Sequence, residues 1–139
     1  MERTLVLIKP DAMQRNLAGA IISRLEKLGL KLVALKMLHP DKALAQRHYA
    51  VHKDKPFYND LVNYITSSPI AACVFEGKEA VETIRKAMGA TDPAKAEKGT
   101  IRGDFGLSIE KNSVHGSDSP ANAEVEIKLF FPPDELFGY

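Results

Sequence analysis

Residues 112–119 read N-S-V-H-G-S-D-S, and they are the stretch of this chain whose residue types are best suited to chemistry. His115 carries a titratable ring, and the Ser119-Pro120 pair has the pattern of a helix N-cap with proline at the first helical position. Free N–H groups and the dipole at a helix N-terminus favour negative charge. A histidine beside such a terminus indicates phosphoryl chemistry, with the imidazole as nucleophile or as acid and base. Ordinary turns use the same residue types, so the rest of the chain has to decide between the two interpretations.

Four short apolar runs predict the β-strands that position this stretch. They cover residues 4–8, 30–38, 70–75 and 127–131. Helical spacing and cap residues predict helices over residues 20–28, 42–51, 57–66, 78–88 and 121–127. This order predicts an α+β fold of the ferredoxin-like βαββαβ type, in which helices cover a four-stranded antiparallel sheet. The chain is expected to form one domain over residues 1–139.

Residues 90–111 show little periodicity and predict a long loop. A loop of that length inside a small domain is usually functional or disordered. From Arg85 to Arg102, in the approach to this loop and its first half, the charged residues are Arg85, Lys86, Asp92, Lys95, Glu97, Lys98 and Arg102. Their local excess of positive charge suits an anion site, although a mobile insertion with ordinary surface charges would give the same pattern.

Lys9 and a pair of histidines give weaker signals. Lys9 directly follows the first predicted strand, where both ligand-facing groups and solvated charges are found. His48 and His52 are four residues apart in a predicted helix, and a shared metal ion would need further ligands. Because no third ligand is nearby in the sequence, two surface histidines are the favoured interpretation.

Composition limits the possible functions. The chain has a formal net charge of +1 and 45% hydrophobic residues, so it lacks the strongly basic character of bulk nucleic-acid binders. Its one cysteine, Cys73, lies in an apolar run, which predicts a buried thiol, no intrachain disulfide and a reducing compartment. The sequence contains no recognisable signal peptide and no apolar stretch of about 20 residues, so a cytoplasmic protein without a membrane span is expected.

Five motifs, in order along the chain, resemble those of the nucleoside diphosphate kinases. They are Lys9-Pro10-Asp11, Tyr49, the K-P-F-Y of residues 55–58, the G-T-I-R-G-D-F of residues 99–105 and the N-S-V-H-G-S-D-S of residues 112–119. The resemblance covers essentially the whole chain, and the last two motifs together are highly specific. It implies a phosphotransferase that moves the γ-phosphate of a nucleoside triphosphate, mainly ATP, to a nucleoside diphosphate by a ping-pong mechanism with broad base specificity.

The resemblance also implies a role for each matching residue near the phosphates. His115 would be the nucleophile and carry the phosphate on Nδ1, with Ser117 and Glu126 in support. A carboxylate on the other ring nitrogen would fix the tautomer that leaves the attacking nitrogen free. The alternative for Glu126 is an ordinary surface acid on a helix. The residues that would surround the phosphates are Lys9, Tyr49, Arg85, Thr91 and Arg102.

For the nucleoside, the resemblance implies a sugar contact and a base platform. Asn112 would hydrogen-bond the sugar hydroxyl, and Lys9 would also reach the ribose. Phe57 would stack on the base, with Ile109 as an apolar partner opposite. Because every base has a π-face, stacking on Phe57 predicts activity with purine and pyrimidine nucleotides alike.

The resemblance extends to cofactor and partners. Mg²⁺ would arrive with the nucleotide phosphates rather than in a cage of protein ligands. The substrates would be ATP, GTP and other nucleoside and deoxynucleoside diphosphates, and the chain would form a homo-oligomer, with a tetramer favoured over a hexamer. No specific nucleic acid is expected. Lys98 stands where many family members have proline, so loop flexibility and subunit contacts are expected to differ.

Two functions of other classes would use some of the same residues. A phosphohistidine carrier or protein-histidine kinase would need His115 but neither a base platform nor a sugar contact, so Phe57, Lys9 and Asn112 argue against it. A non-catalytic binding module would tolerate the loss of His115 or of the arginines, and neither is lost. Binding of single-stranded nucleic acid by the basic loop would be a side activity, recognisable by its steep salt dependence.

Overall fold

The computed structural model describes residues 1–139, and a four-stranded antiparallel sheet runs through its middle. The strands are β1 (Glu2–Ile8), β2 (Lys31–Leu38), β3 (Ile70–Gly77) and β4 (Val114–Gly116), in the spatial order β2-β3-β1-β4. The helices are α1 (Pro10–Gln14), α2 (Ala18–Glu26), α3 (Lys42–His48), α4 (Tyr58–Ile65), α5 (Ala80–Met88), α6 (Ile101–Phe105) and α7 (Pro120–Phe130). The predicted α+β architecture with an antiparallel sheet is confirmed.

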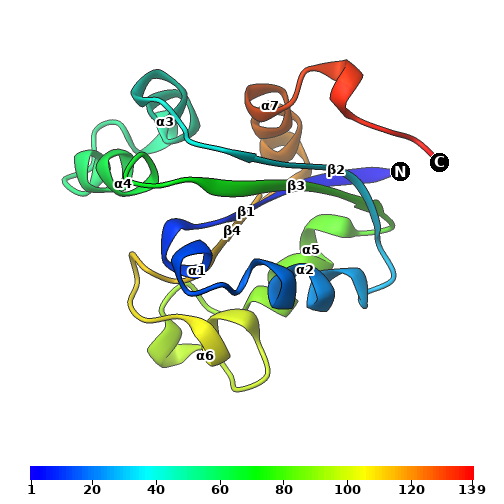
Figure 1. Cartoon of the computed structure of the whole chain (residues 1–139), viewed down its shortest axis with the longest axis horizontal. Coiled ribbons are helices and arrows are strands. Elements are labelled where there is room, and N and C mark those ends of the chain that lie inside the picture. Colours follow the sequence, from blue (N-terminus) through cyan, green and yellow to red (C-terminus); the bar gives the residue numbers. More distant parts are fainter.

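Helices cover both faces of the sheet (Figure 1). Helices α3, α4 and α7 lie on one face, and α1, α2, α5 and α6 lie on the other. Side chains alternate between the faces along a strand, so Leu5 and Leu7 of β1 join the first core and Val6 and Ile8 join the second. Strands β1 and β3 are buried along almost their whole length, which accounts for their continuous apolar runs.

The predicted strand over residues 127–131 is wrong, because these residues end helix α7. The helix begins where the sequence predicts it, with Ser119 accepting a hydrogen bond from the backbone N–H of Asn122. It then continues for eleven residues and buries Ala123, Ile127 and Phe130, which are spaced as one helical face. A short apolar run has no periodicity that separates a strand from a buried helical turn.

The fourth strand is β4 instead, so His115 lies on a strand and not in a loop. Only three residues long, β4 pairs with β1 over Val6–Gly116, Leu7–His115 and Ile8–Val114. These residues form a strand because β1 offers them hydrogen bonds, and their own sequence has no strand pattern. The pairing fixes residues 114–116 of the motif to β1, an inner strand, while β4 itself forms an edge of the sheet.

The loop predicted over residues 90–111 contains two short helices, η2 (Pro93–Lys95) and α6. Thr100 caps α6 by accepting a hydrogen bond from the N–H of Gly103. The predicted helix over residues 42–51 is divided into α3 and η1 (Ala50–His52), and the last turn of the chain is η3 (Pro133–Glu135). Helix α1 was not predicted, because it has only five residues and little periodicity.

Two expectations about apolar segments can be compared with the structure. Cys73 is fully buried in β3, where burial raises the pKa of its thiol to about 12, as expected for a packed core residue. No helix of the chain combines the length and the apolar character that crossing a membrane requires.

Candidate active site

His115 occupies the centre of β4, with its side chain 26% exposed. Gly116, the next residue, packs tightly against helix α5. A Cβ atom at this position would lie 2.6 Å from Sδ of Met88. The glycine therefore lets β4 and α5 approach closely, and it holds the backbone of the histidine against the second core.

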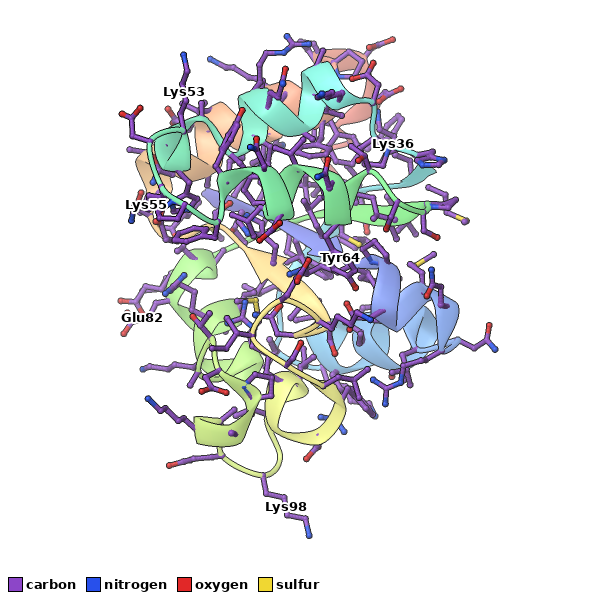
Figure 2. All side chains as sticks on the ribbon, turned by 90° about the vertical axis from the view of Figure 1, so that its left-hand side faces the viewer. Lys36, Lys53, Lys55, Tyr64, Glu82 and Lys98 are labelled. Carbon is purple, nitrogen blue, oxygen red and sulfur yellow. The ribbon has the colours of Figure 1, made fainter.

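A network of polar residues around Asp11, just after the end of β1, braces the entrance to β4. Ser113 adopts a positive φ of 76°, and its N–H donates to Oδ2 of Asp11 at 3.1 Å. The hydroxyl of Tyr64 donates to the other oxygen of Asp11 at 2.6 Å. Tyr64 thus reaches from α4 in one helical layer to α1 in the other (Figure 2). Sequence reasoning missed both roles, because only the fold brings these residues together.

Glu126 lies beside the ring of His115 rather than on the surface. One carboxylate oxygen is 3.1 Å from Nε2 of His115, and the other accepts a 2.6 Å hydrogen bond from the hydroxyl of Ser117. Burial by itself would raise the pKa of Glu126, but the hydrogen bond from His115, its charge and the Ser117 hydroxyl together hold the pKa below its ordinary value. The carboxylate is therefore ionised at neutral pH, so the predicted trio of His115, Ser117 and Glu126 lies together.

The interpretation of His48 as a surface residue is wrong. Its side chain is only 1% exposed, and its ring meets that of His115 edge to face with 4.6 Å between the centroids. Burial, assisted by His115, lowers the pKa of His48 to about 3, so the ring is neutral at pH 7. The helical spacing of His48 with the buried Ala45 was the signal for this position, because both lie on the inner face of α3. His52 is half-buried.

Lys9, Asn112 and Thr91 are connected in one chain of hydrogen bonds. The ammonium of Lys9 donates to the carbonyl of Glu110 at 2.7 Å and to Oδ1 of Asn112 at 3.1 Å. The amide of Asn112 donates to the carbonyl of Thr91 at 3.0 Å. Burial lowers the pKa of Lys9 to about 8, the charge of Asp11 opposes that shift, and nearby Arg102 adds to it.

Arg102, Arg85 and Thr91 line a cleft of about 740 Å³ beside α5. Arg102 is buried and donates to the carbonyls of Gly89 and Val114, while its Nε has no hydrogen-bond partner. Burial and the charge of Arg85 lower the pKa of Arg102 to about 10. The cleft also carries acidic side chains, among them Asp118 from the turn after His115. The lining holds four acidic side chains, Glu2, Glu79, Glu82 and Asp118, against three basic ones, Arg85, Lys86 and Arg102. The local excess of positive charge that the sequence led us to expect is therefore not found in this cleft.

The predicted nucleoside contacts lie farther out. Phe57 is 44% exposed at the start of α4, and its ring centroid lies 5.6 Å from that of His52. Ile109 is 61% exposed in the segment before β4. Lys55, close to Phe57 in the sequence and in space, projects on the same side of the molecule as Glu82 of the cleft (Figure 2).

Tyr49 is buried behind the histidine pair. Its ring lies 4.6 Å from that of His48, and burial together with the nearby charge of Glu126 raises the pKa of its hydroxyl. The site therefore has the neutral ring of His48 beside His115, a lysine and two arginines nearby and an ionised carboxylate on one ring nitrogen. Such an arrangement suits a nucleophilic imidazole that receives an anionic group.

Comparison with known proteins agrees with this chemistry. A family model described as nucleoside diphosphate kinase matches residues 2–136. A nucleoside diphosphate kinase of Dehalococcoides mccartyi is 63% identical over 139 residues, which are 100% of this chain and 98% of the relative. One of Archaeoglobus fulgidus is 55% identical and is covered to 92%.

Solved structures of the same kind superpose closely. A halophilic nucleoside diphosphate kinase from Halobacterium salinarum, in complex with CDP, has a TM-score of 0.97 and 50% identity, with 99% of this chain and 92% of that chain covered. A nucleoside diphosphate kinase family protein from Babesia bovis has a TM-score of 0.97 and 44% identity, with 100% and 94% covered. The ferredoxin-like fold predicted from the sequence agrees with both.

Proposed function

This chain belongs to the nucleoside diphosphate kinase family and is an enzyme of that class, and we propose that it moves phosphate between nucleotides by way of His115. The observation that carries the proposal is the contact between Nε2 of His115 and the carboxylate of Glu126. With Glu126 ionised, Nε2 carries the ring proton and donates a hydrogen bond to the carboxylate. Nδ1 then has a free lone pair and becomes the nucleophilic atom.

The reaction proceeds in two matched steps. Nδ1 of His115 attacks the γ-phosphorus of a nucleoside triphosphate, the bond from phosphorus to the bridging oxygen breaks, and the nucleoside diphosphate leaves. A second nucleoside diphosphate then binds, and its terminal phosphate oxygen takes the phosphoryl group from Nδ1. Because one pocket serves donor and acceptor in turn, the kinetics are ping-pong.

Positioning and charge do most of the remaining work. Phosphoryl transfer spreads negative charge over the transferred oxygens, and fixed cations stabilise it. We assign this role to Lys9, Arg85 and Arg102, with the hydroxyls of Thr91 and Tyr49. Ser117 holds Glu126 through its 2.6 Å hydrogen bond and thereby maintains the orientation of the histidine ring.

Recognition of the nucleoside is assigned to exposed and polar groups around the cleft. Phe57 offers an aromatic face to the base, Ile109 supplies an apolar neighbour, and Asn112 and Lys9 meet the sugar hydroxyls. Stacking does not select among bases, so purine and pyrimidine substrates are both expected, including GTP and deoxynucleoside diphosphates. The complex of the Halobacterium salinarum relative with CDP supports this for a pyrimidine.

A kinase of this family needs a divalent metal ion, and we propose Mg²⁺. The residues assigned to the phosphates fit an ion that the nucleotide brings. Arg85 and Arg102 of the cleft are cations and cannot be metal ligands, and Thr91 beside them offers only a hydroxyl. Mg²⁺ keeps several waters and prefers phosphate oxygens to an all-protein cage. When bound, it would neutralise charge on the phosphates.

We further propose that residues 1–139 act as one domain in a cytoplasmic homo-oligomer, with a tetramer favoured over a hexamer. The buried, reduced Cys73 supports a reducing compartment. An exposed apolar edge of the sheet at Leu35 and Met37 supports contact between subunits. Lys98 lies at the exposed tip of the segment before α6, as Figure 2 shows, so its effect on subunit contacts is open to test.

Phosphate labelling tests the central proposal. Protein mixed with γ-labelled ATP is expected to acquire acid-labile, alkali-stable phosphate and to lose it when a nucleoside diphosphate is added. His115→Ala is expected to abolish both labelling and transfer, because the attacking nitrogen is gone. His39→Ala, which changes an exposed histidine that bonds the carbonyl of Thr66, is the matched control and should be labelled normally. Full transfer activity in His115→Ala would refute the assignment.

A further inference from the structure

Three potential metal ligands converge at the centre of the site. Nε2 of His115 lies 3.1 Å from Oε2 of Glu126, and Nδ1 of His48 lies 3.6 Å from the same oxygen. Ligand atoms of all three residues lie within 4.8 Å of one another. They come from three different elements, α3, β4 and α7, so only the fold assembles them.

His48 has no hydrogen-bond partner that would explain its burial. Its side chain is 1% exposed, and neither Nδ1 nor Nε2 has a partner. A buried polar group without a partner costs free energy, and most such groups in folded proteins are satisfied. The proposed phosphoryl transfer uses His115 and Glu126 but gives His48 no chemical task.

We propose that His48, His115 and Glu126 bind a transition metal ion of the zinc type. Zinc takes ligands at about 2.0–2.2 Å in tetrahedral geometry, which separates neighbouring ligand atoms by roughly 3.3 Å. The observed separations of 3.1 and 3.6 Å from Oε2 of Glu126 lie on either side of that value. Two imidazoles and one carboxylate form a zinc ligand set, and the partial exposure of His115 leaves the fourth position open to water.

The surroundings support these ligands and select against magnesium. The hydroxyl of Ser117 bonds Oε1 of Glu126 and leaves Oε2 directed at the two rings. The ring of Phe130 lies 5.3 Å from that of His48 and shields the site from one side. Imidazole ligands suit zinc, nickel, cobalt and copper, whereas Mg²⁺ prefers oxygen. The site is therefore distinct from the Mg²⁺ that a nucleotide carries.

A metal ion bound at this site would prevent His115 from attacking phosphorus. A metal ion on Nε2 of a neutral imidazole takes the lone pair of that nitrogen, so the ring proton must move to Nδ1. Nδ1 is then protonated and cannot attack phosphorus. This consequence rests on the proposed function of His115, whereas the binding of the ion does not.

Direct titration tests the binding. Nucleotide-free protein is titrated with ZnCl₂ by calorimetry, and with CoCl₂ while the visible absorption of tetrahedral cobalt is followed. We expect one ion per chain, a cobalt spectrum of tetrahedral type, and no displacement by an equal concentration of Mg²⁺. Absence of zinc uptake, or complete displacement by Mg²⁺, would overturn the proposal.

Two ligand variants and one control assign the site. His48→Gln and Glu126→Gln are each expected to weaken zinc binding by about 100-fold or more, since even outer-shell changes cost 10–100-fold. His39→Gln, outside the cluster, should bind zinc as the wild type does. Circular dichroism first shows whether each variant is folded as the wild type is. If His48→Gln is unfolded, the zinc affinity of Glu126→Gln alone tests the site. Wild-type affinity in a folded ligand variant would refute the site.

Labelling of zinc-loaded protein tests this inhibition separately. Protein freed of excess zinc by desalting is expected to lose phosphate labelling by ATP, and a chelator should restore it. Normal labelling of the loaded protein would refute the inhibition. Metal-free protein that is never labelled would instead count against His115 as the nucleophile and leave the binding result unaffected.

Discussion

At the scale of single residues, the environment of each group sets its chemistry. Glu126 remains ionised because His115 and Ser117 bond it, and that charge selects the ring tautomer of the histidine. His48 is kept neutral by burial, so it adds no positive charge beside His115. Lys9 is cationic at neutral pH but close to losing its proton.

Glu126→Gln is expected to slow phosphorylation of His115 by about 10–100-fold, since an amide no longer fixes the tautomer of the ring. The rate of labelling by ATP in a rapid-quench experiment measures the effect. Glu124→Gln changes an exposed acid on the same helix and serves as the matched control. Equal rates in the two variants would contradict the role of Glu126.

We expect kcat/KM for ATP to fall as the pH rises above about 8. With its pKa lowered to about 8, Lys9 loses its positive charge in that range. Lys9→Arg keeps its charge, so the loss of activity above pH 8 should disappear in this variant. The free energy of unfolding changes with pH in the opposite direction to the activity. Between the folded pKa of about 8 and the ordinary 10.5, the unfolded chain binds more protons, so the free energy of unfolding rises with pH. Identical pH profiles for wild type and Lys9→Arg would refute the assignment.

At the scale of elements, the site depends on how closely a three-residue strand packs on a helix. Strand β4 is attached to β1, and Gly116 allows α5 to approach it. Helix α7 starts at the Ser119 cap and presents Glu126 to the strand. Small changes in this packing therefore act directly on the position of His115.

Gly116→Ala is expected to destabilise the protein by about 1–3 kcal/mol, because its Cβ atom would lie 2.6 Å from Sδ of Met88. Chemical denaturation followed by circular dichroism gives the free energy of unfolding. Gly19→Ala is the matched control, since its added methyl group meets nothing within 4 Å and the position lies in helix α2. That change should stabilise the protein by about 0.4–1 kcal/mol. The idea of a close β4–α5 contact fails if both variants unfold at the same denaturant concentration.

At the scale of the whole molecule, the sheet ends in two edge strands, the short β4 and the eight-residue β2. Strand β2 pairs only with β3, and the C-terminal segment covers part of its other side through the N–H of Phe137 and the carbonyl of Val33. Beyond that point Leu35 and Met37 are 52% and 68% exposed. An apolar edge of this kind favours contact with another chain.

The double variant Leu35→Lys/Met37→Lys is expected to reduce the size of the assembly, because charge on an apolar interface costs desolvation free energy. Light scattering after size-exclusion chromatography measures the mass. Val125→Lys places a charge at a residue that is 61% exposed on α7 and should leave the mass unchanged. An unchanged mass in the double variant would place the subunit contact elsewhere.

Local signals in the sequence determined much of this protein. The family motifs, the Ser119 cap, the alternation along β1 and the buried Cys73 depend on residues close together in the chain, and all of these could be predicted. The residue types of the site were equally visible, since phosphoryl transfer requires a nucleophile and fixed cations.

Tertiary structure alone decided the rest. Residues 127–131 became helix because their neighbours on α7 share one buried face, and β4 became a strand because β1 offers it hydrogen bonds. His48 joined His115 and Glu126 through packing of α3 against α7. Contacts between residues far apart in the chain leave no periodicity in either segment, so only the assembled core could reveal the histidine pair and the metal site that we infer from it.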